Sequence, residues 1–337
     1  MKKVAAAGII LIVWLIAGFK TANEISFVIP KGWPKPVYDF KKNPLTESGI
    51  ALGRKLFYDP VLSRDSTISC MSCHLQFTAF AHVDHALSHG IDGRIGKRNS
   101  MSLVNLAWSR RFMWDGSVNH LDVQALAPMS NHLEMDEDIK NVVKKLQAGP
   151  VYPPLFQKTF GDSTITGERL LKSISQFMLT MVSANSKYDK MRRGEEKFTE
   201  QESNGYKLFQ KNCGACHAEP LFTNGQFENN GLAVDTTLND FGQITVTHRQ
   251  GDSLKFKVPT LRNIEFSYPY MHDGRFKNLS QVINNYIRGI QHGPTLSPKL
   301  KNGIYLSNTE KVDLMAFLLT LTDKEFLFNP AFSPPNK

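Results

Sequence analysis

Apolar residues recur at helical spacing in three stretches of the chain. Residues 136–147 and 168–181 place apolar side chains three or four positions apart, which is the pattern of an amphipathic helix with one face in a core. Residues 309–321 repeat this pattern behind an Asn308-Thr309 start. The apolar face of this last stretch consists of Val312, Met315, Ala316 and Leu319. We therefore predict a mainly α fold.

Long loops separate the predicted helices. Gly and Pro are concentrated in residues 90–96, 149–154 and 289–298. A short two-stranded element is predicted around residues 243–258.

One local pattern occurs twice. Gly53 precedes Phe57 by four residues, and Gly205 precedes Phe209 by the same distance. Residues four apart share one face of a helix, and a glycine there lets a second helix cross closely. The repeat predicts two similar units, each beginning with such a helix.

The expected domains are residues 23–165 and 166–337, after an N-terminal segment of residues 1–22. The boundary follows the break in the pattern at Gly161-Asp162-Ser163, and the charged residues 187–202 offer a second candidate. We expect the last residues of the chain to pack back on the first domain.

The N-terminus has the form of an export signal. Met1-Lys2-Lys3 precedes the uncharged, mostly apolar residues 4–19. This stretch lies between a signal core and a full membrane span in length, and Phe19 and Lys20 stand where a cleavage site would need small residues. We expect export to the periplasm, with residues 1–22 acting as a signal peptide or as an N-terminal anchor.

Composition narrows the class of partner. The chain has 337 residues, a net charge of +9, 41% hydrophobic residues and 21% charged residues. This length suits two domains of ordinary size. Lys and Arg do not alternate with aromatic residues in any run, so we discount nucleic acid. A basic surface suits an acidic partner protein or a membrane surface.

All four cysteines belong to one five-residue motif that occurs twice. Cys70, Cys73 and His74 form Cys-x-x-Cys-His, and the motif returns at the second pair. Its second copy consists of Cys213, Cys216 and His217. This is the attachment signature of haem c, in which two thioethers hold the porphyrin and the histidine binds iron. Redox disulfides or a split zinc site are the alternatives, but neither requires the two histidines. The sequence therefore predicts two covalent haems c.

Further strings extend the match over nearly the whole chain after residue 22. They are Leu56-Phe57-Tyr58-Asp59-Pro60, Lys97-Arg98-Asn99, Trp114-Asp115-Gly116, Asn131-His132-Leu133-Glu134-Met135, Val258-Pro259-Thr260-Leu261-Arg262-Asn263 and Pro269-Tyr270-Met271-His272-Asp273-Gly274. Together they resemble the bacterial di-haem cytochrome c peroxidase family. The resemblance implies two cytochrome domains with haems near their interface, a peroxidatic haem in the N-terminal domain and an electron-transfer haem in the C-terminal domain.

The resemblance assigns catalytic roles to residues of the first domain. Glu134 matches the family's acid/base carboxyl group, which can move a proton between the two oxygens of peroxide. Gln124 matches the distal glutamine, Pro128 a residue that shapes the same pocket, and Trp114 the tryptophan between the haems. Asn99, with the carbonyl groups of Ser267 and Pro269, matches an interdomain calcium site.

The ligand of the second iron departs from the peroxidases. The resemblance places a methionine fourteen residues after the histidine of His-Asp-Gly, and here that position is Tyr286. A tyrosine there resembles the MauG-like branch, whose best-known member oxidises residues of another protein. Phenolate favours ferric iron and should lower the potential by a large part of the roughly 0.8 V that axial ligands control. Met271 or Met315 is the alternative ligand.

Three other residues are expected near the haems. His89 stands near the place of a resting-state ligand of the first iron, although His82 and His85 are close in sequence. Arg262 and His272 are expected around the second haem, in contact with its propionates.

The sequence thus predicts reduction of hydrogen peroxide to water with electrons from a small donor protein, a cytochrome c or a cupredoxin. A MauG-like oxidase acting on a protein or organic substrate is the first alternative. A non-catalytic electron carrier with both irons closed is the second. Family members are often dimers, so a homodimer is compatible with the resemblance.

Overall fold

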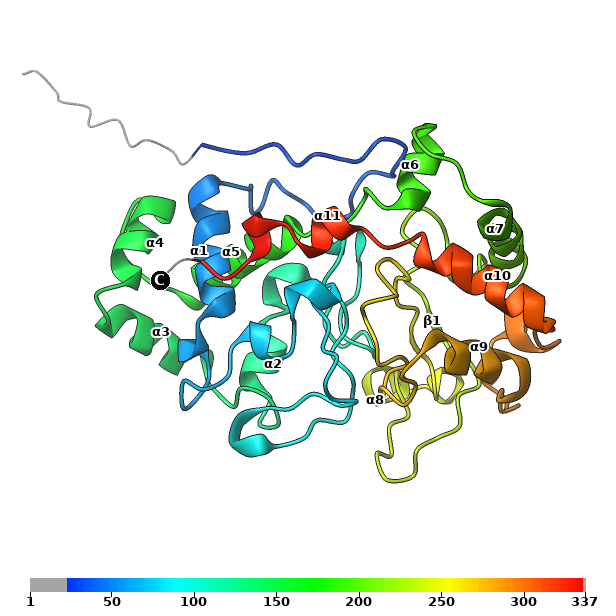
Figure 1. The fold of residues 1–337 in the computed structure, drawn as a ribbon. Helices are drawn as coiled ribbons and strands as arrows, with labels where there is room; N and C mark the ends of the chain where they lie inside the picture. Colours follow the sequence, from blue (N-terminus) through cyan, green and yellow to red (C-terminus); the bar gives the residue numbers. More distant parts are fainter. Residues whose placement is uncertain (1–22, 336–337) are drawn as a thin grey trace, which may run out of the picture.

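Two helix pairs, one in each half of the chain, organise the fold (Figure 1). In the first pair α1 (Glu47–Tyr58) packs on α5 (Gly167–Leu179). In the second pair α7 (Glu200–Asn212) packs on α10 (Asn308–Leu319). The computed structural model describes residues 23–335, so the expected signal or anchor at residues 1–22 lies outside the described residues. Within residues 23–335, every helix is too short or too polar to cross a bilayer.

The remaining elements are short and lie between or beside these pairs. The other α-helices are α2 (Leu126–Ser130), α3 (Ile139–Ala148), α4 (Tyr152–Phe160), α6 (Lys187–Arg193), α8 (Ile244–Thr247), α9 (Leu279–Arg288) and α11 (Lys324–Leu327). The strands are β1 (Phe227–Glu228) and β2 (Phe256–Lys257), which pair antiparallel. A mainly α fold with long loops is confirmed.

The three predicted amphipathic helices are present as α3, α5 and α10. The prediction of two strands within residues 243–258 was wrong, because that segment begins with α8 and supplies β2 alone, whose partner β1 lies earlier in the chain. The predicted loop at residues 149–154 already contains the start of α4. Proline is tolerated in the first turn of a helix, because the N–H groups of that turn have no acceptor within the helix.

Side-chain caps fix the starts of the paired helices. The Thr46 hydroxyl accepts a hydrogen bond from the Gly49 N–H at the start of α1. Thr199 and Glu202 form a reciprocal capping box on α7, and Ser307 and Glu310 form one on α10. Each such cap contributes about 1 kcal/mol by satisfying N–H groups that the helix itself leaves unpaired.

Each pair crosses at a glycine. A Cβ atom on Gly53 would lie 1.8 Å from the Ser173 carbonyl oxygen of α5. A Cβ atom on Gly205 would lie 1.9 Å from the Asp313 carbonyl oxygen of α10. The sequence repeat therefore corresponds to the same close crossing in both halves, as predicted.

The two halves have separate hydrophobic cores, and the last residues join the first one. Helix α5 packs in the first core, so the expected boundary at residues 165/166 is wrong in its position and the change of core follows α5. Phe326, Leu327 and Phe332 also lie in this first core. The chain end, red in Figure 1, runs back across the molecule to α1.

Two side chains of α1 hold this returning tail. The Arg54 guanidinium donates hydrogen bonds to the Ser333 and Pro330 carbonyl oxygens at 2.6 and 3.0 Å. The Tyr58 hydroxyl donates to the Phe332 carbonyl oxygen. These backbone acceptors do not depend on the identity of the tail residues, so the tail sequence alone gives little sign of its docking.

We predict that Gly53→Ala and Gly205→Ala each destabilise the haem-loaded protein by about 1–3 kcal/mol, because the added methyl group must push two packed helices apart. The measurement is urea unfolding followed by far-ultraviolet circular dichroism. Gly251→Ala is the matched control, since its Cβ atom meets nothing within 4 Å. Equal midpoints for all three variants would contradict the crossing.

Candidate active site

The first Cys-x-x-Cys-His motif forms a tight turn after α1. Cys70–Ser72 is a 3₁₀ turn, and the Ser69 N–H donates to the Ser72 hydroxyl at 3.1 Å. The His74 Nδ1 atom lies 2.6 Å from the Phe80 carbonyl oxygen. With its proton on Nδ1, the ring turns Nε2 away from this carbonyl group and leaves it free for a metal. Burial lowers the pKa of His74 to about 4, so the imidazole is neutral, the form that binds iron.

The second motif repeats this arrangement. The His217 Nδ1 atom lies 3.2 Å from the Phe222 carbonyl oxygen and 3.1 Å from the Pro259 carbonyl oxygen. Burial lowers the pKa of His217 to about 4. None of the four cysteines is in a disulfide, so all four thiols remain for thioether bonds. Both motifs therefore fit covalent haem.

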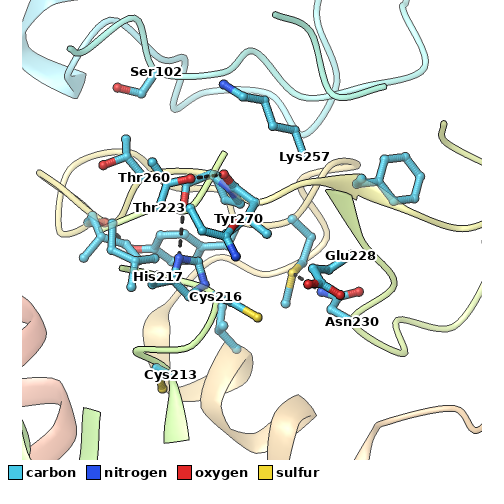
Figure 2. Close-up of a pocket in the computed structure, with 18 of the residues that line it drawn as sticks. Ser102, Cys213, Cys216, His217, Thr223, Glu228, Asn230, Lys257, Thr260 and Tyr270 are labelled. Carbon is cyan, nitrogen blue, oxygen red and sulfur yellow. Dashed lines mark hydrogen bonds between the residues drawn. The ribbon is translucent and has the colours of Figure 1, made fainter. Parts of the chain in front are cut away.

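A cavity of about 390 Å³ adjoins the second motif. Cys213, Cys216 and His217 line one side of it, as Figure 2 shows. Trp108 and Trp114, which come from the first half of the chain, line another side. A flat, mostly apolar group bound here would lie between the two halves, which agrees with haems near the domain interface.

Two candidate ligands of the second iron reach this cavity. Tyr286 extends from α9, and Met271 lies in the loop before α9 with a positive φ of 76°. The Asn230 Nδ2 atom donates to both the Tyr286 hydroxyl, at 3.4 Å, and the Met271 sulfur atom, at 3.5 Å. The two candidate ligand atoms therefore lie beside the same amide group, and the geometry leaves both candidates open. Met315 instead packs against the second core.

His272 lines the same cavity, as expected, but Arg262 does not. The His272 ring stacks on Phe256 with centroids 3.7 Å apart. Arg262 is fully buried, and its guanidinium donates two hydrogen bonds of 2.8 Å to the Asp189 carboxylate and others to the Pro220 carbonyl oxygen. The expectation that Arg262 contacts a haem is wrong, because the residue does not line the cavity and its buried guanidinium is directed at Asp189 and Pro220.

Glu134 lies near the first motif. The Cys73 sulfur atom lies 3.5 Å from the His89 carbonyl oxygen, and a Cβ atom on the next residue, Gly90, would lie 2.5 Å from the Glu134 Cα atom. Burial, together with the Glu134 charge, raises the pKa of the Cys73 thiol to about 11. The Asn131 Nδ2 atom donates to Glu134 Oε1 at 2.9 Å, and the Ile91 N–H donates to the Glu134 carbonyl oxygen at 2.8 Å. Burial raises the pKa of Glu134 itself.

A ring of four charges clamps the Glu134 loop. Arg64 and Arg94 each pair with both Asp92 and Asp136, over N–O distances of 2.5–3.0 Å. The Arg64 N–H also donates to the Met135 carbonyl oxygen. The ring joins the loop that carries Glu134 to residues 90–96. The sequence analysis missed it, because its four members come from three separate loops.

Gln124 and Pro128 come from the same stretch of chain as Glu134. The Gln124 Nε2 atom donates to the Met113 sulfur atom at 3.7 Å. Pro128 lies in α2, and its carbonyl oxygen accepts from the Met135 N–H at 3.2 Å. This bond ties α2 to the residue next to Glu134.

Trp114 lies at the contact between the halves. Its indole Nε1 donates to the Asn99 carbonyl oxygen at 2.8 Å, and its ring centroid lies 6.5 Å from that of His272. Asn99 in turn donates its backbone N–H to the His272 carbonyl oxygen at 2.7 Å.

The residues expected to bind calcium border the same cavity. Asn99, Ser267 and Pro269 all line it. Among residues 23–335, no hydrogen bond uses the Asn99 side-chain oxygen or the Ser267 and Pro269 carbonyl oxygens. Unused oxygen acceptors suit a hard cation, so these residues fit Ca²⁺.

His89 lies in a row of stacked histidines. Its ring centroid is 3.9 Å from that of His85, which is 5.2 Å from that of His82. The His89 carbonyl oxygen lies 3.5 Å from the Cys73 sulfur atom. The backbone of His89 thus adjoins the first motif, while its ring stacks on His85.

Comparisons with known proteins agree with this geometry. The family model described as di-haem cytochrome c peroxidase matches residues 47–197, and that described as cytochrome c matches residues 202–322. The methylamine utilization protein MauG of Methylorubrum extorquens is 34% identical, over 89% of this chain and 84% of its own. The cytochrome c551 peroxidase of Nitrosomonas europaea is 32% identical, over 95% of this chain and 90% of its own.

A solved structure matches in fold and sequence. A MauG-like protein associated with microbial copper homeostasis superposes with a TM-score of 0.83 and 32% identity, covering 92% of this chain and 99% of that chain. Because the family models and these relatives match most of the chain, and because both haem-binding motifs are present, the chain belongs to the di-haem cytochrome c peroxidase family, which includes the MauG proteins.

Proposed function

We propose that this protein reduces hydrogen peroxide to water at the haem of His74, with electrons that enter at the haem of His217. The donor is a small redox protein, a cytochrome c or a cupredoxin. The observation that carries the proposal is the Glu134 carboxyl group, which is partly buried beside Cys73 and has a raised pKa. Bound haem would supply the iron that takes up peroxide and passes electrons to it.

Glu134 provides the proton transfer that the reaction needs. Reduction of one peroxide molecule to two water molecules consumes two electrons and two protons. Burial, which disfavours the charged carboxylate, lets Glu134 hold a proton and release it to the departing oxygen. The Asn131 amide and the clamp on its loop keep this carboxyl group in one position. Gln124 supplies an amide on the same side, and Pro128 limits the space there.

Trp114 is proposed to carry electrons between the haems. It lines the cavity of the second motif, and it contacts Asn99 in the stretch that leads back to the first. Asn99, Ser267 and Pro269 are proposed to bind Ca²⁺ beside it. A cation there would fix the relative position of the two halves around the indole. His89 is proposed as a resting-state ligand of the first iron.

Export is part of the proposal. Residues 1–19 have the charge and apolar pattern of a secretory signal, and covalent haem attachment agrees with a periplasmic protein. The proposal leaves residues 1–22 as a removed signal or as a membrane tether.

A MauG-like oxidation of a protein or an organic substrate is the second candidate. Tyr286 favours this candidate, because its hydroxyl group lies in the cavity of the second motif beside Asn230. Burial raises the pKa of Tyr286 to about 12, so only the charge of a metal would remove its proton at neutral pH. A phenolate ligand would make the second haem a poor acceptor from a high-potential donor.

We predict that Glu134→Gln keeps both haems and lowers the steady-state rate of peroxide reduction by roughly 100- to 10,000-fold, the usual range for loss of a general acid–base group. The assay follows oxidation of a reduced cytochrome c at increasing peroxide. Glu168→Gln is the control, because this exposed carboxylate forms only a surface pair with Lys172. Full turnover in the Glu134 variant would remove the residue from the mechanism.

For the second iron, we predict that Tyr286→Phe changes the ferric electronic and EPR spectra and raises the midpoint potential of that haem, because an anionic ligand is lost. Met271→Leu should leave both unchanged. The opposite result, with a near-infrared His/Met band in the wild type that Met271→Leu abolishes, would identify Met271 as the ligand.

The two candidate functions also differ in their need for a donor. A peroxidase of the proposed kind consumes peroxide in proportion to the reduced donor protein supplied. If the fully oxidised protein consumed peroxide and oxidised an added organic substrate without any donor, the MauG-like function would replace the first proposal.

A further inference from the structure

Lys257 is a buried cation for which the described residues provide no counter-charge. It lies on β2 and is 8% exposed. Within residues 23–335, the only hydrogen-bond partner of its ammonium group is the Ser109 hydroxyl oxygen, at 3.5 Å. The other cations buried near this interface are paired, Arg262 with Asp189 and Arg98 with Asp115 and Asp240. Burying an unpaired ammonium group costs free energy, and an anion beside Lys257 would offset this cost. Residues 23–335 do not supply such an anion.

The cavity of the second motif lies against this lysine. Lys257 lines the cavity together with Cys213, Cys216 and His217. Figure 2 shows the two cysteines at one end and Lys257 and Ser102 at the other, with His217 between them. In haem c the cysteines bond to the vinyl edge of the porphyrin, and the two propionates leave from the opposite edge. Attachment at Cys213 and Cys216 therefore directs the propionates towards the end where Lys257 lies.

We propose that Lys257 is the counter-charge of a propionate of the second haem and raises the reduction potential of that haem. An ammonium group and a carboxylate form a charge-assisted hydrogen bond, and no carboxylate among residues 23–335 pairs with Lys257. The positive charge favours the ferrous state, which carries one positive charge fewer than the ferric state. Lys257 thus takes the role that the sequence had suggested for Arg262.

Two other cationic side chains line the cavity, Lys299 and Arg110, but Arg110 is exposed to solvent, where an unpaired charge costs little. The ammonium group of Lys299 pairs with the Glu228 carboxylate. Burial without a partner lowers the pKa of Lys257 to about 8, and a neighbouring carboxylate would raise it again. A bound carboxylate would therefore stabilise the charged form of Lys257.

The position of Lys257 also joins the proposed propionate to the contact between the halves. The Lys257 N–H donates to the Trp114 carbonyl oxygen at 2.8 Å, and its ammonium group reaches Ser109 of the first half. Because Trp114 is the proposed electron carrier, the lysine acts as a positioning residue beside the route between the haems. This inference does not depend on whether Tyr286 or Met271 binds the second iron, nor on the reaction at the first.

The test is spectroelectrochemical titration of the holoprotein with Lys257→Met, Lys257→Arg and Lys255→Met. Lys255→Met is the matched control, since it removes one positive charge two residues away from a lysine paired with Asp252. At a fixed ambient potential, Lys257→Met should raise the ferric-to-ferrous ratio of the second haem about tenfold, a fall in midpoint of about 59 mV for one electron. Lys257→Arg should stay near the wild type, as should the control.

Resonance Raman spectra provide a readout that is separate from the potential. The propionate-bending band of the second haem should shift in Lys257→Met and not in Lys255→Met. If Lys257→Met fails to load two haems, Lys257→Gln provides the same comparison with a polar, uncharged side chain. An unchanged potential and band in a di-haem Lys257 variant would overturn the proposal. A change confined to the first haem would overturn it too, because the carboxylate would then belong to the other porphyrin.

Discussion

The orientation of two imidazole rings is the constraint on which the rest of this structure depends. Each ring must present Nε2 to an iron, and in each case a backbone carbonyl group on Nδ1 fixes that orientation. Phe80 and Phe222 supply these carbonyl groups, and both residues are fully buried with a positive φ of 57° and 54°. A left-handed phenylalanine is costly, so the packing of its ring has to compensate. The aromatic core thus fixes Phe80 and Phe222, whose carbonyl groups orient the two histidines.

The helix crossings complete the same arrangement. Phe57 packs near Phe80, and Phe209 packs near Phe222, with ring centroids 5.9 and 5.5 Å apart. Each of these phenylalanines lies four residues after the glycine at which its helix is crossed. The glycine crossing fixes the position of the helix, and the helix places its phenylalanine in the aromatic core. This core in turn holds the backbone carbonyl group that orients the histidine. This chain of contacts explains why Gly-x-x-x-Phe before Cys-x-x-Cys-His could be interpreted from sequence: every member is local or repeats at fixed spacing.

Features that join distant segments were harder to predict. The sequence identified α5 as an amphipathic helix but assigned it to the wrong half, because periodicity shows that a face is buried and not which partner buries it. Arg262 lies within a string that matches the family, yet its role depends on Asp189, seventy-three positions away. The Arg64 and Arg94 clamp and the Asn230 amide likewise depend on loops that only the fold brings together. The attachment residues, by contrast, were predictable because covalent chemistry fixes their spacing.

The interface between the halves has an unusual distribution of charge. Arg98 is neutralised by Asp115 of its own half and Asp240 of the other, and this ion pair holds the halves together beside His272. The ammonium group of Lys257, by contrast, has only a hydroxyl group for a partner within residues 23–335. A protein that needed Lys257 only for packing would gain stability from an apolar residue of similar size, because burying a lone charge costs several kcal/mol. The same position becomes favourable once a carboxylate enters the cavity. If Lys257 pairs with a propionate as proposed, folding of the second half and haem attachment are coupled through charge as well as through the cysteines.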